Sequence, residues 1–538
     1  MSKDFVQNKK SLHLSSVLRT SAIVFLFLVA AKLLNFFKKI LIGQLFGVSS
    51  VADSFFAASY LPYYLALFFE GVLFLGFLPL FSQLVTEKGE RKAGEFVSEI
   101  SLAILLLTGF LVVLGWRSAP WVIRQLVPGF SSSEQHLTLE LFRIHSLIVI
   151  FISLTSFFKA LNSYFEHYAL AASSALVDTV VMIGVTLAGW RVWGIYSAAW
   201  GAVAGAFSAL LFQAGLLFRK HPIFVPRFSL RNTWVAKLFV FLIPMGVIWG
   251  FQQIPLVLLN RFGSGMWEGT ISALSISQAL TIVPVGLVNH TVLFAVFPSL
   301  TKQASEPTLE NLRGTFFQTL RGGFFILVPI GFLLTVLARP LTVLFFSGGG
   351  VSEEGTKRIA NSLTCFGWAT FALYADVFMT QSLIAIRKPS PAIFLCASRA
   401  VLTYVIGYVL STLWDYQGLA LSFSLAMTLN LFLLFPLFFR MSPFQGKWKN
   451  LFGYAAKLIL AASPIFLMVW FVNQWSVKSW VGFRAPLQIA GLVAGSLAGL
   501  GIYLLGLSWL KVEEARSVWQ EVRRSWAKKT WWLAEQSE

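Results

Sequence analysis

Charged residues are scarce in this sequence of 538 amino acids, since Asp, Glu, Lys and Arg together make up only 12% of it. A typical soluble domain is about one quarter charged. Cysteine is also rare: Cys365 and Cys396 form no CxxC motif and no metal-ligand spacing. The composition therefore excludes soluble enzymes, disordered chains and secreted disulfide-bonded scaffolds. The two cysteines are predicted to be inert thiols in the core.

Motifs for nucleotide binding and hydrolysis are also missing. The chain has no GxxxxGK[ST] sequence, no HExxH sequence, no Ser/His/Asp arrangement, and no soluble segment long enough to hold a nucleotide. We therefore expect neither an enzyme nor a cofactor. Transport would depend on a substrate gradient, an ion gradient or the membrane potential, the last contributing ~2.3 kcal/mol per charge per 100 mV.

Long apolar runs are abundant, with 57% hydrophobic residues, 53 Phe and 19 Trp. A helix needs ~20 mostly apolar residues to cross the hydrocarbon core of a bilayer. The sequence predicts an all-α integral membrane protein with about 14 transmembrane helices. The predicted spans are 20–43, 55–85, 98–116, 139–160, 168–189, 194–218, 238–258, 270–300, 322–345, 359–385, 392–412, 419–439, 452–474 and 485–508.

The formal net charge of +19 is explained by membrane topology. With an even number of spans, 26 Lys and Arg residues fall on the side of the two termini and 8 on the opposite side. Cytoplasmic loops carry the excess of Lys and Arg, so both termini are predicted to be cytoplasmic. Because the basic residues are not clustered on a soluble domain, we expect no nucleic-acid partner.

An internal repeat relates the two halves of the chain. Pro62 and Pro284 are 222 residues apart, Gly194 and Gly418 are 224 apart, and LNSYFEHYALA aligns with LIAIRKPSPAI in the same frame. Parallel six-helix repeats are a feature of secondary transporters, whose substrate site lies between the repeats. The predicted regions are a cytoplasmic N-terminus (1–19), an N-terminal lobe (20–218), a cytoplasmic linker (219–237), a C-terminal lobe (238–440), two additional helices (452–508) and a basic, Trp-rich amphipathic tail (509–538).

Five charged residues near the first two spans are candidate substrate-binding groups. Lys32, Lys38 and Lys39 lie in the first span, and helical phase puts Lys32 and Lys39 on one face. Lys38 and Lys39 could instead extend to the membrane surface. Glu70, deep in the second span, could pair with a first-span lysine or take up a proton or a cation, and Asp53 could simply cap its own helix.

The remaining intramembrane charges have less specific interpretations. Asp178, Asp376, Arg399 and His290 are isolated in the sequence, and they are predicted to be buried polar ties between helices. Lys159 lies near a span end and is expected to reach the surface. The N-terminal cavity is thus predicted to be cationic and to attract an anion such as a phosphate.

Several motifs resemble one known family. The segment FFKKILIGQLFGVSSVADSFFAASYLPYYL is similar to the opening motif of the MurJ (MviN) lipid II flippases, within the multidrug/oligosaccharidyl-lipid/polysaccharide (MOP) exporter superfamily. VPVGLVNHTVLFAVFPSLTK and LARPLTVLFFSGGGVS also match the family pattern in order. The resemblance covers roughly residues 20–440, and the two extra C-terminal helices agree with it.

The resemblance implies a flippase that moves lipid-linked peptidoglycan precursor from the cytoplasmic to the periplasmic leaflet of the bacterial inner membrane. The family's first-span arginines, thought to hold the diphosphate, correspond to Lys32 and Lys38, and its second-span Asp corresponds to Asp53. The partners implied are a lipid-linked anionic saccharide, membrane lipids and cell-wall synthesis proteins, with the chain acting as a monomer.

The sequence also departs from the family pattern. LPYYLAL replaces the arginine-containing segment of the second span, and SISQALTIVP lacks the charged pair of the eighth span. A lysine is a point charge, so bidentate recognition of a diphosphate is weakened. An exporter of another lipid-linked saccharide, such as an O-antigen or polysaccharide flippase, or an ion-coupled drug antiporter remains the alternative.

Overall fold

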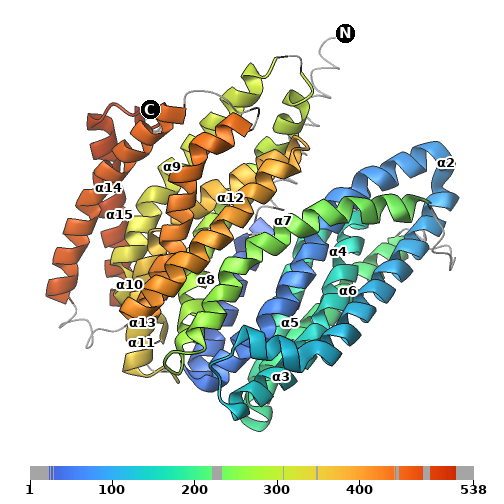
Figure 1. Ribbon diagram of the computed structural model, residues 1–538, viewed down its shortest axis with the longest axis horizontal. Helices are drawn as coiled ribbons and strands as arrows, with labels where there is room; N and C mark the ends of the chain where they lie inside the picture. The colour runs from blue at the N-terminus through green and yellow to red at the C-terminus, as the bar shows by residue number, and fades with distance from the viewer. Residues whose placement is uncertain are drawn as a thin grey trace, which may run out of the picture. The chain divides into compact units, whose positions relative to one another are not determined.

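A computed structural model describes residues 24, 26–27, 29–220, 233–306, 308–346, 349–441, 443, 448–476 and 485–516. Residues 1–19, most of the linker and the tail beyond residue 516 lie outside this part, as does the side chain of His290. The described part is helical and contains no strand (Figure 1), which agrees with the predicted all-α class.

The first described helix covers residues 29–46. The helices that follow are α2 (Ser50–Leu126), α3 (Ser132–Ser146), α4 (Ile148–Tyr164), α5 (Tyr168–Trp193), α6 (Tyr196–Lys220), α7 (Thr233–Gly263), α8 (Thr270–Gln303), α9 (Glu310–Val336), α10 (Ala338–Phe346), α11 (Glu353–Gly367), α12 (Thr370–Ala385), α13 (Pro389–Met441), α14 (Trp448–Ser476) and α15 (Ala485–Trp509).

The described helices overlap the predicted spans, but not one for one, since the predicted spans 139–160, 322–345 and 359–385 each cross from one helix into the next. Among the described residues, seven helices are long and apolar enough to cross a membrane, or eight if α11 and α12, bent by 54°, form one span. Two of the continuous helices each contain two predicted spans. Helix α2 is interrupted at Gly89, whose positive φ of 78° suits glycine, and α13 is interrupted at Trp414 and Asp415. The total of fourteen spans stays a prediction.

The chain forms two compact units. Unit 1 comprises residues 1–279, 348–355 and 407–419, and unit 2 comprises 280–347, 356–406 and 420–538. In unit 1, α2 packs against α3, α4 and α7, and α5 packs against α6. In unit 2, α9 packs against α12, α14 and α15. The lobe boundaries proposed from the sequence stay predictions.

Matching turns support the internal repeat. Glu166, between α4 and α5, has a φ of 61°, and Arg387, between α12 and α13, has a φ of 56°. In each turn the next amide donates to the carbonyl five residues earlier: His167 to Asn162 at 2.8 Å, and Lys388 to Leu383 at 2.9 Å. This hydrogen bond and the left-handed residue are the features of a Schellman helix end. The two halves therefore end their fourth and tenth predicted spans in the same way.

A second pair of turns fixes the register of the repeat. Gly194 ends α5 with φ 51° and ψ −134°, and Asp415 interrupts α13 with φ 52° and ψ −137°. In each of the two pairs, the matching turn residues are 221 positions apart in the sequence. The alignment of LNSYFEHYALA with LIAIRKPSPAI predicted from the sequence is therefore one residue out of register, because it matched side-chain character and not backbone conformation.

Close packing of α5 on α6 depends on glycine. A Cβ atom at Gly205 would lie 2.4 Å from the carbonyl oxygen of Asp178, and one at Gly201 would lie 2.9 Å from the carbonyl oxygen of Met182. Small residues four apart allow membrane helices to approach closely. This contact holds the backbone of Asp178 against α6.

In unit 2, Asp376 of α12 pairs with Arg399 of α13, and their side chains are only 5% and 3% exposed. The two residues are isolated in the sequence, where 23 positions separate them, and they come together only when the two helices pack. Their interpretation as a polar tie between helices is confirmed. Cys396 is buried and Cys365 is partly buried, and both are free thiols.

Candidate functional site

The lysines of the first helix are the starting point of the candidate site, which lies entirely within unit 1. Lys32, Lys38 and Lys39 are all half-buried. An ammonium group inside a membrane protein is costly unless it meets an anion, a polar group or water. Their neighbours therefore indicate what each lysine can do.

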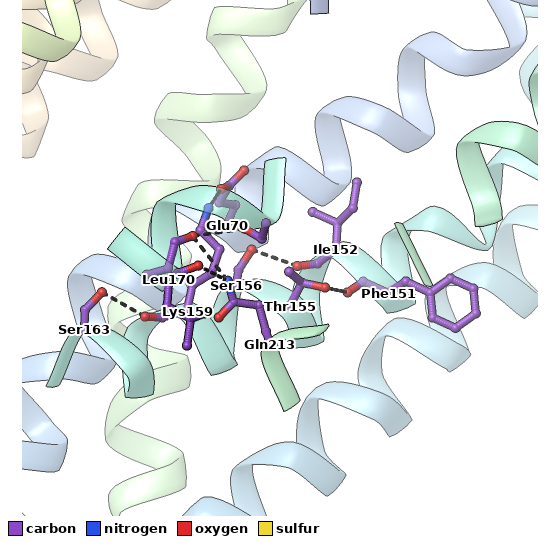
Figure 2. A network of polar contacts seen from close by, with 11 residues as sticks. Glu70, Phe151, Ile152, Thr155, Ser156, Lys159, Ser163, Leu170 and Gln213 are labelled. Carbon is purple, nitrogen blue, oxygen red and sulfur yellow. Dashed lines mark hydrogen bonds and ion pairs between the residues drawn. The ribbon is translucent and has the colours of Figure 1, made fainter. Parts of the chain in front are cut away.

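Glu70 of α2 forms an ion pair with Lys159 of α4, with 2.5 Å between Oε1 and Nζ (Figure 2). The two side chains are 34% and 21% exposed. For Glu70, a pair with a first-span lysine was one of three alternatives, and the structure shows Lys159 in an ion pair with it. The expectation that Lys159 simply reaches the surface was therefore wrong. The sequence could not show this, because 89 positions separate the two residues.

Lys32 lies within electrostatic range of the same pair. It is attracted by Glu70 and repelled by Lys159. The carboxylate of Glu70 thus lies near two ammonium groups from different helices. This arrangement leaves an excess of positive charge beside the first helix.

Lys38 has a different set of neighbours. Its Nζ lies 5.9 Å from the centroid of the Tyr63 ring, and its charge interacts with that of Asp178 on α5. Asp178 in turn is within electrostatic range of Glu70. A cation near a tyrosine ring is attracted to its face. Lys38 is therefore within electrostatic range of the acidic residues of the N-terminal helices. Helical phase had put it on another face of the first helix from Lys32.

Lys39 faces a helix that is remote in sequence. Its Nζ donates a hydrogen bond of 3.4 Å to the carbonyl oxygen of Ser275 at the start of α8. Lys38 is close enough to repel it. Helical phase put Lys32 and Lys39 on one face, but it could not show which helix each lysine meets.

Asp53 is buried and stabilises the start of α8. One carboxylate oxygen accepts from the amide of Gly269 at 2.8 Å, and the other accepts from the amide of Ser272 at 2.6 Å. The idea that Asp53 caps its own helix was wrong, because the side chain of Ser49 caps α2. The first amides of a helix have no hydrogen-bond acceptors within that helix. Asp53, which lies on α2, provides acceptors for two amides at the start of α8.

Replacing Asp53 with alanine should destabilise the protein by about 1–3 kcal/mol, because two buried amides lose their acceptor. Thermal melting of the purified protein in detergent would measure the change. Asp53→Asn is the matched control, since it keeps one carbonyl acceptor and should lose less stability. If Asp53→Ala melts like the wild type but no longer transports, Asp53 is a substrate group and not a helix cap.

Four lysines and two carboxylates make up this cluster: Lys32, Lys38, Lys39, Lys159, Glu70 and Asp178. When all six are ionised, four positive and two negative charges leave a net charge of +2. A group of ammonium ions in a low-dielectric setting attracts anions. The cluster can therefore hold an anionic group such as a diphosphate.

Sequence reasoning missed Lys159 as a member of this cluster and Tyr63 as the ring near Lys38. Lys159 carried a usable signal, since it is an intramembrane lysine in the apolar segment LTSFFKALNSY. Tyr63 carried none, because a tyrosine in an apolar helix is common. An open pocket of about 530 Å³ also lies in unit 1, lined by Phe262, Gly265, Met266, Trp267, Ser411 and Asp415, but no member of the cluster lines it.

Comparison with known sequences gives a consistent result. The sequence profile of a family described as "Lipid II flippase MurJ" matches residues 42–490. A "Probable lipid II flippase MurJ" of Buchnera aphidicola subsp. Schizaphis graminum is 25% identical over 508 residues, covering 92% of this chain and 98% of that protein. The "Lipid II flippase MurJ" of Burkholderia cenocepacia is 23% identical, covering 90% and 95%.

Solved structures share the fold. A lipid II flippase MurJ in an inward closed conformation superposes with a TM-score of 0.71 at 20% identity, covering 92% of this chain and 98% of that one. An inward-facing multidrug resistance MATE family transporter of the MOP superfamily superposes with a TM-score of 0.66 at 14% identity, covering 79% and 99%. At these identities the likeness shows the fold alone, and this confirms the predicted MOP/MATE-like class.

Proposed function

This chain belongs to the MurJ lipid II flippase family, and we propose that it moves lipid II from the cytoplasmic to the periplasmic leaflet of the bacterial inner membrane. The main observation that supports a binding site in unit 1 is the excess of lysine ammonium groups among the N-terminal helices. We propose that Lys32 and Lys38 contact the diphosphate of the lipid, because each is within electrostatic range of an acidic residue whose charge a phosphate could replace.

The other candidate residues have supporting roles in this proposal. Lys39 adds positive charge next to Lys38, and Glu70 balances the charge of Lys32. Asp53 acts through the start of α8, whose residue Ser275 accepts from Lys39. We further propose that both termini are cytoplasmic and that the chain works as a monomer; the 26-to-8 distribution of basic residues supports the orientation.

Complementation tests the function directly. Expression of this chain in a bacterium depleted of its own lipid II flippase should restore growth and prevent lysis. Membrane insertion should be verified in the same cells by detecting the chain in the inner-membrane fraction. Lysis of cells that contain the inserted chain would contradict the proposal.

A flippase for another lipid-linked saccharide is the second candidate. It is favoured by the replacement of family arginines, since the second span reads LPYYLAL and lysine cannot form the planar two-point contact of arginine. Rescue of a polysaccharide or O-antigen flippase mutant, together with failure to rescue the lipid II flippase mutant, would favour this candidate.

A further inference from the structure

Lys159 differs from the other lysines of the cluster because it does not lie on the first helix. It projects from α4 and meets Glu70 of α2 at 2.5 Å. About one fifth of the Lys159 side chain and one third of the Glu70 side chain remain accessible. The pair is thus not sealed in the helix packing, and a small anionic group can approach it.

The backbone that carries Lys159 is held firmly by a polar network (Figure 2). Asn162, one turn further along α4, donates to the side chain of Gln213 on α6 at 2.7 Å, and Gln213 donates to the carbonyl of Leu170 on α5 at 2.8 Å. The carbonyl of Lys159 accepts from the hydroxyl of Ser163 at 2.8 Å. The bonds of Gln213 join α4 to α5 and α6, so the turn of α4 that carries Lys159 is tied to both neighbouring helices.

The charges around Lys159 favour exchange of its anionic partner. Lys32 lies within electrostatic range of both members of the pair, so Glu70 keeps a cationic neighbour if it leaves Lys159. Breaking this partly buried pair without a replacement would leave the ammonium group of Lys159 without an anion, at a cost in free energy. An incoming phosphate removes that cost, since it supplies a new anion to Lys159 at the moment Glu70 leaves.

We propose that Lys159 is a further phosphate-binding residue of this site and that Glu70 is its exchangeable counter-ion. A diphosphate replaces Glu70 on Lys159 when the lipid binds, and Glu70 returns when the lipid leaves. Lys159 is thereby charged and paired in both states, and the returning carboxylate favours release of the product. This inference rests on the proposed function, because it assumes a diphosphate lipid as the substrate.

The effects of substitutions on ligand binding distinguish this exchange from a purely structural role of the ion pair between α2 and α4. If the pair only joins the helices, loss of either partner should lower stability, and loss of either should weaken ligand binding or leave it unchanged. If Glu70 competes with phosphate, the two substitutions should act with opposite signs. Loss of Lys159 should weaken binding of the diphosphate, and neutralisation of Glu70 should strengthen it.

Equilibrium binding of a polyprenyl diphosphate to the purified full-length protein in detergent tests the inference. We expect Lys159→Met to weaken binding by about tenfold and Lys159→Arg to restore most of it, as for loss of a charge pair in a desolvated site. Glu70→Gln should tighten binding by about threefold or more, because a nearby negative charge is removed. In proteoliposomes, Glu70→Gln should slow net flipping, since release becomes slower.

Melting temperatures measured on the same samples show whether each variant is folded. If Glu70→Gln does not fold, Glu70→Asp should still tighten binding slightly, since its shorter side chain draws the carboxylate back from Lys159. Weaker or unchanged binding in a folded Glu70 variant overturns the exchange. If the wild type does not bind the diphosphate lipid, or Lys32→Met binds it equally well, the proposed function fails. If Lys32→Met weakens binding but the Glu70 variants do not strengthen it, only the exchange fails.

Discussion

Replacing Lys32 with methionine should reduce the rate of lipid II flipping by roughly 30- to 150-fold, which corresponds to about 2–3 kcal/mol for a charge lost from a desolvated contact. Lys32 is half-buried on the first helix and has Glu70 and Lys159 as charged neighbours. Methionine keeps an unbranched chain of similar length and removes only the charge. Flipping is measured in proteoliposomes as the appearance of lipid II in the opposite leaflet.

Two control variants make this experiment specific. Lys32→Arg keeps the positive charge and should retain most of the activity. Lys92→Ala removes a lysine that is 53% exposed in an ion pair with Glu95 at the surface, and it should flip at the wild-type rate. If Lys32→Met flips lipid II as fast as Lys92→Ala, Lys32 is a structural charge and does not contact the substrate.

Replacing Asp376 with alanine should destabilise the protein by about 3–5 kcal/mol, because Arg399 would be left as an unpaired buried charge. Both side chains are almost fully buried between α12 and α13. Unfolding of the purified protein in detergent, followed by circular dichroism during titration with a denaturing detergent, would measure the loss. The effect should be seen in stability, since neither residue belongs to the lysine cluster.

Simultaneous replacement of both partners separates pairing from packing. Asp376→Leu combined with Arg399→Met should recover most of the lost stability, since apolar residues of similar volume often replace a buried ion pair at little cost. One oxygen of Asp376, Oδ1, has no hydrogen-bond partner among the described residues, which makes such recovery easier. The pair of the exposed Lys92 with Glu95 is the control, and Lys92→Ala should cost less than about 1 kcal/mol. A double variant as unstable as Asp376→Ala would contradict this account.

The sequence was sufficient for properties that depend on local composition. Spans were recognisable because ~20 apolar residues are needed wherever a helix crosses lipid, and the distribution of Lys and Arg predicted an orientation. The repeat was visible from the recurrence of Pro62 and Gly194 at Pro284 and Gly418. The turns at Glu166 and Arg387 and at Gly194 and Asp415 fixed its register at 221 residues, so the match of Gly194 with Gly418 was three residues out. The lysines of the first helix stood out because charge is rare in an apolar span.

By itself, then, the sequence determined an all-helical membrane protein with a duplicated architecture and an unusual group of lysines in its first span. Only the tertiary structure decided the partners of the charged residues inside the helices. Glu70 meets Lys159, Lys38 is near Asp178, Asp53 binds the start of α8, and Asp376 pairs with Arg399. The physical reason is that hydropathy and helical phase are set by neighbours within one helix. An ion pair or a helix cap between distant segments depends on how helices pack, and one sequence does not encode that packing in any local pattern.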